Sequence, residues 1–153
     1  MSKRLVPGWT EPIYLDASAL VKLLVPEPES DILNQSLLGT EDVVVSDLAL
    51  TEVASALGRR MREGLLTATE ARRVLREAAK LAAACRLAEL TPPTHRRAER
   101  LLLTSRDAAL RTLDALHIAL ALDAGAATLV TFDARLARAA STQHLFVAPE
   151  TVP

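Results

Sequence analysis

The stretch LRTLDALHIALAL, residues 110–122, is the part of this sequence around which the fold is organised. Its apolar residues fall on every side of a helical wheel, and its ionisable residues are Arg111, Asp114 and His117. A helix that is apolar all round is buried on nearly all faces, so a carboxylate in its first turn is costly unless something compensates its charge. Two compensations for Asp114 are open: the amides and dipole at the start of the helix, or a metal ion shared with other acids.

Short apolar or β-branched runs alternate with helical segments on both sides of this stretch. The expected strands are residues 13–16, 43–45, 87–90, 128–132 and 145–147. Strands that alternate with helices form a parallel sheet covered by helices on both faces. The sequence therefore predicts an α/β fold, a three-layer α/β/α arrangement with a short central parallel sheet.

The length and the breaker residues indicate one domain with short ends. At 153 residues the chain is in the size range of a single domain. We expect an N-terminal extension over residues 1–12, the domain over 13–148 and a tail over 149–153. In the extension, prolines and a glycine oppose regular structure, and Trp9 is interpreted as a packing anchor. Pro92 and Pro93 are expected to separate the strand at 87–90 from a helix at 94–105.

Composition limits the cellular setting. The formal net charge is -1, from 18 Lys and Arg against 19 Asp and Glu, so no global basic field indicates nucleic acid. One cysteine, Cys85, excludes an internal disulfide and suits a reducing compartment; we interpret it as a core residue. We expect no secretory signal and no membrane span, and predict a cytoplasmic location.

Four acids follow strands or begin helices: Asp16, Glu52, Asp114 and Asp133. Parallel strands end at one edge of the sheet, and so do the helix starts that follow them. Each acid alone could be a helix cap or a surface residue, but four in one cleft repel one another unless a cation neutralises them. All-oxygen ligands without a His or Cys cluster favour Mg²⁺ or Mn²⁺. Such ions commonly serve phosphoryl chemistry.

Two hydroxyls lie two residues from these acids, Ser18 near Asp16 and Thr131 near Asp133. Each is suited to orient a carboxylate or a metal-bound water. His117 follows Asp114 by three residues, a spacing that could share a metal, but we prefer a packed histidine with a hydrogen-bond partner. For Arg111, pairing with Asp114 and contact with a substrate phosphate both stay open.

Four segments of the chain resemble the acidic motifs of the PIN-domain ribonucleases. They are IYLDASALVKLL (13–24), SDLALTEVASAL (46–57), LRTLDALHIALAL (110–122) and LVTFDARLARAA (129–140). Their order and spacing are similar to those of the VapC toxins of type II toxin–antitoxin pairs. The resemblance implies Mg²⁺- or Mn²⁺-dependent RNA cleavage, and it carries metal binding to the four acids with Ser18 and Thr131 as supports. It further implies a homodimer and a VapB-type antitoxin that occupies the active cleft.

Other functions stay open beside this one. A non-catalytic PIN-like module would bind RNA or a protein without cleavage, because fold alone does not fix function. A metal-dependent phosphatase with Asp16 as nucleophile is less favoured, because Ser18 stands where a second Asp is usual. Three arginine clusters are interpreted as solvated helix faces, one of which could contact RNA. They are Arg59, Arg60 and Arg62; Arg72, Arg73 and Arg76; and Arg96, Arg97 and Arg100.

Overall fold

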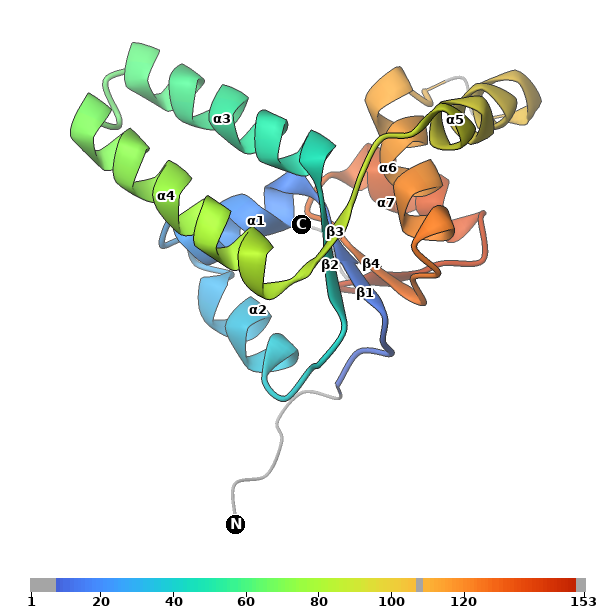
Figure 1. Ribbon diagram of the computed structural model, residues 1–153, viewed down its shortest axis with the longest axis horizontal. Helices are drawn as coiled ribbons and strands as arrows, with labels where there is room; N and C mark the ends of the chain where they lie inside the picture. Colours follow the sequence, from blue (N-terminus) through green and yellow to red (C-terminus); the bar gives the residue numbers. More distant parts are fainter. Residues whose placement is uncertain (1–7, 107–108, 151–153) are drawn as a thin grey trace.

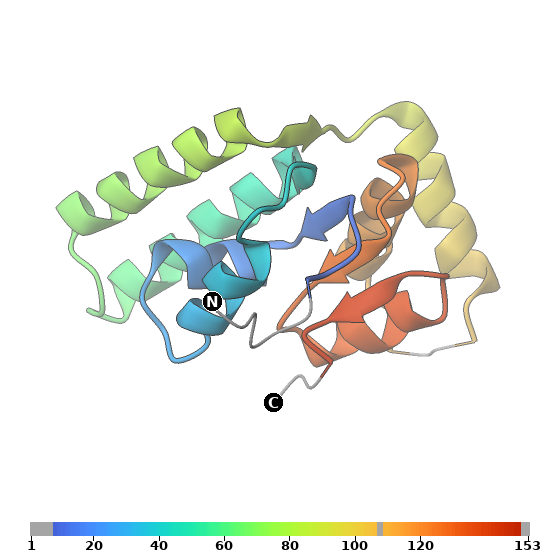
Figure 2. The same ribbon diagram turned by 90° about the horizontal axis from the view of Figure 1, so that it is seen from below.

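The computed structural model describes residues 8–106 and 109–150 as a parallel sheet with helices on both faces (Figures 1 and 2). The strands are β1 (Ile13–Leu15), β2 (Val43–Ser46), β3 (Arg86–Ala88), β4 (Thr128–Val130) and β5 (Phe146–Ala148). The helices are α1 (Ala17–Leu24), α2 (Ser30–Leu37), α3 (Asp47–Arg62), α4 (Ala68–Ala84), α5 (Pro92–Thr104), α6 (Thr112–Asp123) and α7 (Ala134–Ser141). The strand order is β3-β2-β1-β4-β5 and all neighbours pair in parallel. The predicted fold class is confirmed.

The strands separate two apolar cores because successive side chains point to opposite faces. On β1, Ile13 and Leu15 pack with buried residues of α1 to α4, whereas Tyr14 packs with buried residues of α6 and α7. Val45 and Val44 of β2 divide between the two cores in the same way. This is why β1 is a continuous apolar run rather than an alternating one, and why helices lie on both sides of the sheet in Figure 1.

Helix α6 is the most enclosed helix, as its sequence predicts. It lies between α5 and the apolar core that contains Tyr14 (Figure 1), and its exposed residues are at its two ends. Its buried residues are Asp114, Ala115, His117, Ile118, Ala119, Leu120 and Ala121. Two of these are ionisable, so the site chemistry is built into the core rather than onto the surface.

The two prolines at 92 and 93 begin a helix instead of separating two elements. Helix α5 starts at Pro92, two residues before the expected position. Thr91 caps it, since the Thr91 hydroxyl accepts a bond from the Thr94 amide at 3.3 Å. Proline fits the first turn of a helix because the amide that it lacks has no intrahelical partner there. The expectation that both prolines lie outside the helix is therefore wrong.

Residues 8–12 lie at the edge of the sheet where the strands begin, opposite its carboxyl edge. Trp9 is partly buried against the first core, and Glu11 Oε1 accepts bonds from the amides of Glu41 and Asp42 at 2.5 and 2.6 Å. Residues 1–7 of the expected extension and 151–153 of the expected tail lie outside the described residues. Across residues 8–106 and 109–150, no helix has the length and apolar character that crossing a membrane requires.

Candidate active site

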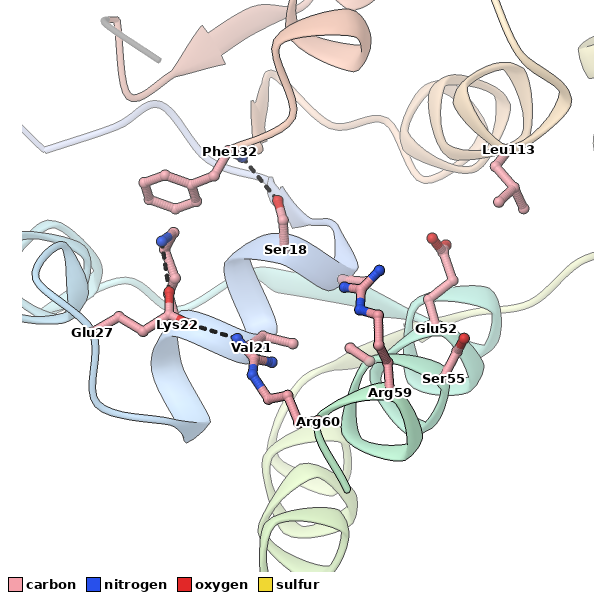
Figure 3. A pocket seen from close by; sticks show the side chains of 12 residues that line it. Ser18, Val21, Lys22, Glu27, Glu52, Ser55, Arg59, Arg60, Leu113 and Phe132 are labelled. Carbon is pink, nitrogen blue, oxygen red and sulfur yellow. Dashed lines mark hydrogen bonds and ion pairs between the residues drawn. The ribbon is translucent and has the colours of Figure 1, made fainter. Parts of the chain in front are cut away.

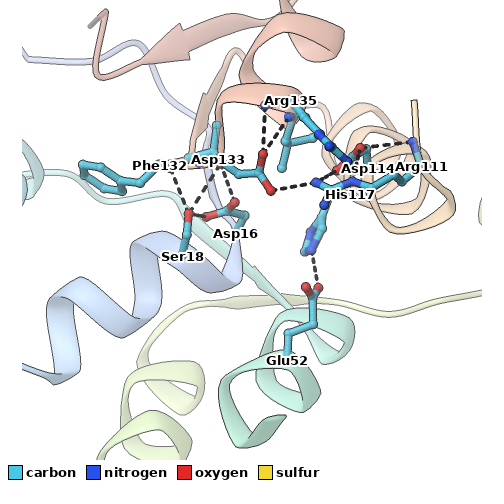
Figure 4. Close-up of polar contacts among 11 residues, drawn as sticks. Asp16, Ser18, Glu52, Arg111, Asp114, His117, Phe132, Asp133 and Arg135 are labelled. Carbon is cyan, nitrogen blue, oxygen red and sulfur yellow. Dashed lines mark hydrogen bonds and ion pairs between the residues drawn. The ribbon is translucent and has the colours of Figure 1, made fainter. Parts of the chain in front are cut away.

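The four sequence-predicted acids all reach the carboxyl edge of the sheet (Figure 4). Asp16 follows β1 and caps α1, Glu52 lies in the second turn of α3, and Asp133 follows β4 and caps α7. Asp114 arrives by another route, because α6 follows α5 rather than a strand. A helix that leads into a parallel strand must begin at the carboxyl edge, which places Asp114 there as well. All four line one cavity of about 120 Å³.

Asp16 is buried and accepts hydrogen bonds at both carboxylate oxygens. Ser18 Oγ donates to Oδ1 at 2.7 Å, and Thr131 Oγ1 donates to Oδ2 at 2.5 Å. The two hydroxyls themselves accept bonds from the Phe132 and Asp133 amides, at 2.8 and 3.0 Å. Their single protons are therefore directed at Asp16, and the turn after β4 fixes the orientation of this carboxylate.

Burial dominates the electrostatics of Asp16. Desolvation raises the pKa of its carboxyl, although the charge of His117 and the bonds from Thr131, Ala19 and Ser18 lower it. The Ala19 amide bond at 2.9 Å is a helix cap, so Asp16 caps α1 and also faces the shared cavity. A group that is costly to ionise in its own surroundings gains from a cation placed beside it.

Arg111 compensates Asp114, which answers the question raised by the sequence of α6. Arg111 Nε lies 3.0 Å from Asp114 Oδ2, and Arg111 Nη2 lies 2.9 Å from Oδ1. The Arg111 amide also donates to Oδ2 at 3.1 Å, as a helix-start amide would. The same Nη2 donates to Asp133 Oδ2 at 2.7 Å. One guanidinium thus joins two of the candidate ligands.

The contact between Arg111 and Asp133 shifts the pKa values of the two side chains in opposite directions. Burial raises the pKa of Asp133, but the bonds from Arg111 and from the Arg135 and Leu136 amides outweigh it and lower the pKa below its ordinary value. Hydrogen bonds from Arg111 to Asp114 and Asp133 raise the pKa of the guanidinium. The mutual repulsion expected among four free carboxylates is therefore relieved by a cation of the chain itself.

His117 is a packed histidine with a partner at each ring nitrogen, as predicted. Nε2 lies 2.5 Å from Glu52 Oε1, and Nδ1 lies 2.7 Å from the Tyr14 hydroxyl. Tyr14 in turn donates to Ser46 Oγ at 2.9 Å. Burial raises the pKa of Tyr14 and keeps it a neutral phenol. This chain of contacts ties Glu52 to the strands β1 and β2.

The donor set fits a hard divalent cation. Four carboxylates from four elements line one cavity, no sulfur ligand is among them, and such oxygen donors suit Mg²⁺ or Mn²⁺. Among the described residues, however, no three His, Cys, Asp or Glu side chains are placed so that together they could hold a metal ion. Arg111 and His117 lie among the acids and hold three of them.

Sequence reasoning missed two of these relationships. The Tyr14–His117 contact spans 103 residues, and the contact between Arg111 and Asp133 joins two different motifs. Only the spacing of Arg111 and Asp114, three residues apart at a helix start, could be read locally. Cys85, expected in the core, is only partly buried at the end of α4.

Comparison with known proteins agrees with the fold and the motifs. Ribonucleases VapC45 and VapC46 of Mycobacterium tuberculosis are 37% and 39% identical to this chain, covering 90% and 88% of it and 94% and 95% of their own lengths. The crystal structure of FitAcB from Neisseria gonorrhoeae superposes with a TM-score of 0.69 at 18% identity, covering 88% of this chain and 95% of its own. That of the M. tuberculosis toxin VapC20 has a TM-score of 0.66 at 19% identity, covering 83% and 94%. The family description that matches residues 13–141 is that of the PIN domain, and the chain belongs to the PIN domain family.

Proposed function

We propose that this protein is an endoribonuclease, the toxin of a toxin–antitoxin pair, and that it hydrolyses RNA phosphodiester bonds with the help of Mg²⁺ or Mn²⁺. The observation that carries the proposal is the cavity lined by Asp16, Glu52, Asp114 and Asp133 in a PIN-domain chain. The VapC relatives, which are named ribonucleases and align along most of this chain, support the choice of RNA.

The chain's own residues prepare this chemistry. A bound Mg²⁺ or Mn²⁺ would activate an attacking water and neutralise charge on the phosphate. Asp16 would hold the cation with both oxygens oriented by Ser18 and Thr131. Glu52 would be aimed from the opposite side of the cavity by His117. Asp114 and Asp133 would complete the ligand set, with Arg111 balancing their charge.

Cleavage of a fluorescent single-stranded oligoribonucleotide tests the activity. The purified protein should cleave it with Mn²⁺ or Mg²⁺ and stop when a chelator is added. Asp16→Asn should remove cleavage, whereas Asp31→Asn, an exposed acid on α2, should not. Cleavage that survives the chelator, or an Asp16→Asn enzyme with wild-type rate, would contradict the proposal.

The two alternatives have separate outcomes in the same experiment. A non-catalytic module would bind the oligoribonucleotide without cutting it at any metal concentration. A phosphatase would hydrolyse a small phosphate monoester and leave the phosphodiester chain intact. The presence of all four acids in one cavity favours the nuclease.

We further infer a VapB-type antitoxin as partner. The solved structures of the same fold include VapBC2 from Rickettsia felis bound to a DNA fragment from their promoter. In this chain a groove of about 580 Å³ lies between α1, α2 and α4, beside the α3–α4 hairpin, and is lined largely by leucines. An amphipathic helix laid in such a groove is a common recognition mode. An arginine of the antitoxin would reach the acidic cavity.

We propose that the unit which carries this function is the domain at residues 13–148, and that it assembles as a homodimer. The homodimer is proposed from the resemblance to the VapC toxins, and Leu103 of α5, with 86% of its surface exposed, is a position where an added charge tests an interface through this helix. Sedimentation of the purified protein, with Leu103→Lys for comparison, measures the state of assembly. A wild-type monomer at micromolar concentration would contradict this part of the proposal.

A further inference from the structure

A second, larger pocket adjoins the acidic cavity. It has a volume of about 470 Å³ and lies between α1, α3 and the turn after β4 (Figure 3). Ala17, Ser18, Glu52 and Leu113 line both the pocket and the acidic cavity. The pocket and the acidic cavity are therefore neighbours with a common wall, so an extended molecule bound in the cavity can reach into the pocket.

Most of the charge around the pocket is already paired within the chain. Glu27 accepts from Lys22 at 2.6 Å and from Arg60 at 2.8 Å, and Glu29 accepts from Lys22 at 2.9 Å. Lys22 Nζ also lies 4.8 Å from the centre of the Phe132 ring. Partial burial lowers the pKa of Lys22, but the bonds to Glu27 and Glu29 outweigh it and raise the pKa. Two acids thus balance two cations, and Lys22 and Arg60 form a neutral wall.

Arg59 is different from these two cations. It lines the same pocket, and Figure 3 shows its guanidinium pointing into the space between Ser18 and Glu52. No carboxylate of the described residues lies within ion-pair distance of it. The nearby Glu52 is held by His117 instead. A pocket cation without an internal counter-ion attracts an anion from solution.

The position of Arg59 follows from the period of α3. Glu52, Ala56 and Arg59 are four and then three residues apart, so they form one stripe along the helix. Seven residues of helix separate Glu52 from Arg59, an axial distance of roughly 10 Å. The stripe runs from the acidic cavity along the pocket, and Arg59 lies about two helical turns beyond Glu52.

We propose that Arg59 binds a phosphate of single-stranded RNA that flanks the phosphate being cleaved, so that the pocket is a substrate-positioning subsite. This inference rests on the proposed function. A guanidinium binds a phosphate through two parallel bonds and thereby fixes the direction of the strand. The ion-paired group of Lys22, Arg60, Glu27 and Glu29 has no net charge, so it bounds the pocket without competing for the phosphate. Arg59 is a positioning residue, since it does not reach the acids that would hold the metal ion.

A structural role for Arg59 predicts different behaviour. Arg59, Arg60 and Arg62 all lie in the last turn of α3, where cations interact favourably with the helix dipole. If that were the role of Arg59, its loss would lower the melting temperature and leave RNA binding unchanged. Arg62 is the matched control, because it has the same charge in the same helical turn and does not line the pocket.

The experiment compares wild type, Arg59→Ala, Arg59→Lys and Arg62→Ala on a fluorescent single-stranded oligoribonucleotide. KM and kcat are measured with Mn²⁺, and binding is measured by anisotropy in chelator from 50 to 200 mM salt. Arg59→Ala should raise KM about tenfold with little change in kcat. The slope of log K against log salt should become shallower by about 0.7, the value for one phosphate contact to a single strand. Arg59→Lys should keep the slope and recover part of the affinity, and Arg62→Ala should match wild type.

The outcomes separate the subsite from the function on which it rests. If wild type neither binds nor cleaves the oligoribonucleotide, the proposed function fails and the subsite with it. If wild type cleaves and Arg59→Ala keeps the KM and salt slope of Arg62→Ala, the subsite alone is overturned. A variant that is merely less stable, or that loses only a protein partner, also overturns it.

Discussion

Arg111 donates a hydrogen bond to each carboxylate oxygen of Asp114, from Nε to Oδ2 at 3.0 Å and from Nη2 to Oδ1 at 2.9 Å. The two residues are three positions apart at the start of α6, and they are exposed unequally. The side chain of Asp114 has 4% of its surface exposed, whereas that of Arg111 has 46%. The charge that compensates this buried acid therefore lies within reach of solvent.

Removal of Arg111 should strengthen metal binding. In Arg111→Gln, Asp114 and Asp133 lose the cation that they share, so a divalent ion meets less positive charge. We expect the dissociation constant for Mn²⁺ to fall by about tenfold, equivalent to ~1.4 kcal/mol, measured by titration calorimetry. The dissociation constant of Arg111→Lys for Mn²⁺ should lie between those of wild type and Arg111→Gln. Unchanged or weaker Mn²⁺ binding in Arg111→Gln would show that Arg111 orders the ligands instead of competing with the ion.

Asp114→Asn should lose both cleavage and the stabilisation by metal. Mn²⁺ binds the folded site and not the unfolded chain, so at a hundredfold excess over its dissociation constant it should stabilise wild type by about 2.7 kcal/mol. The variant should show little of this rise. In chelator we expect the variant to be less stable by about 1–2 kcal/mol, because Arg111 loses a buried charged partner.

Thermal melts of both proteins in chelator and in millimolar Mn²⁺ measure these two effects. The direction in chelator distinguishes an ion-paired Asp114 from four free, mutually repelling carboxylates, which would make Asp114→Asn the more stable protein. A wild-type melting temperature indifferent to Mn²⁺ would leave Asp114 as a helix cap.

Thr131→Val should shift the acid limb of the pH–rate profile upward. The Thr131 hydroxyl donates to Asp16 and lowers its pKa, against burial, which raises it. Without that hydroxyl the pKa of Asp16 rises further, and a protonated carboxyl does not hold a cation. Cleavage rates from pH 4 to pH 9 test this, with Thr104→Val on α5 as control. A uniform loss of activity at every pH would indicate damage to the turn instead.

Asp16 and Asp133 should act on stability with opposite signs in the metal-free protein. The pKa of Asp16 in the folded protein is raised above its ordinary value of 3.8. As the pH rises above 3.8, the unfolded chain loses this proton before the folded protein does, so the free energy of unfolding decreases until the pH passes the folded pKa. The pKa of Asp133 is lowered, so its contribution is present above pH 3.8 and is lost as pH falls through the folded value. Urea unfolding of Asp16→Asn and Asp133→Asn against pH, in chelator, checks both signs.

Tyr14→Phe should weaken the fold and slow catalysis together. The Tyr14 hydroxyl bonds both Ser46 and His117, and its removal leaves two buried polar groups without this partner. The expected loss is about 1–3 kcal/mol of the free energy of unfolding. Because His117 holds Glu52, we expect kcat to fall several-fold with KM nearly unchanged. Urea unfolding and steady-state kinetics measure the two quantities, and a stability loss at wild-type kcat would make the link purely structural.

Leu38→Lys should weaken antitoxin binding while leaving RNA cleavage intact. Leu38 lines the apolar groove beside α4 and has 66% of its surface exposed, so the fold should tolerate the change. A buried lysine in the bound complex is costly. Leu65→Lys, at the tip of the α3–α4 hairpin and 67% exposed, is the matched control. Equal antitoxin affinity for both variants, by calorimetry, would place the antitoxin elsewhere.

The sequence alone determined the fold class and the set of acids. Both rest on local patterns: β-branched runs make strands, and an acid after a strand or at a helix start reaches the carboxyl edge of any parallel sheet. Asp16 after β1 and Asp133 after β4 needed no further information. The helix at 110–122 was identified as buried because no side of it is polar.

The tertiary structure decided what each acid contacts. Thr131 meets Asp16 across 115 residues, His117 meets Glu52 across 65, and Arg111 joins Asp114 to Asp133. These contacts depend on the order of strands and the register of packed helices, which sequence spacing does not encode. Pairing energies in a buried site change steeply with distance and solvent exposure. For that reason the sequence predicted four acids at one edge, and only the packed chain showed which of them its own cations hold.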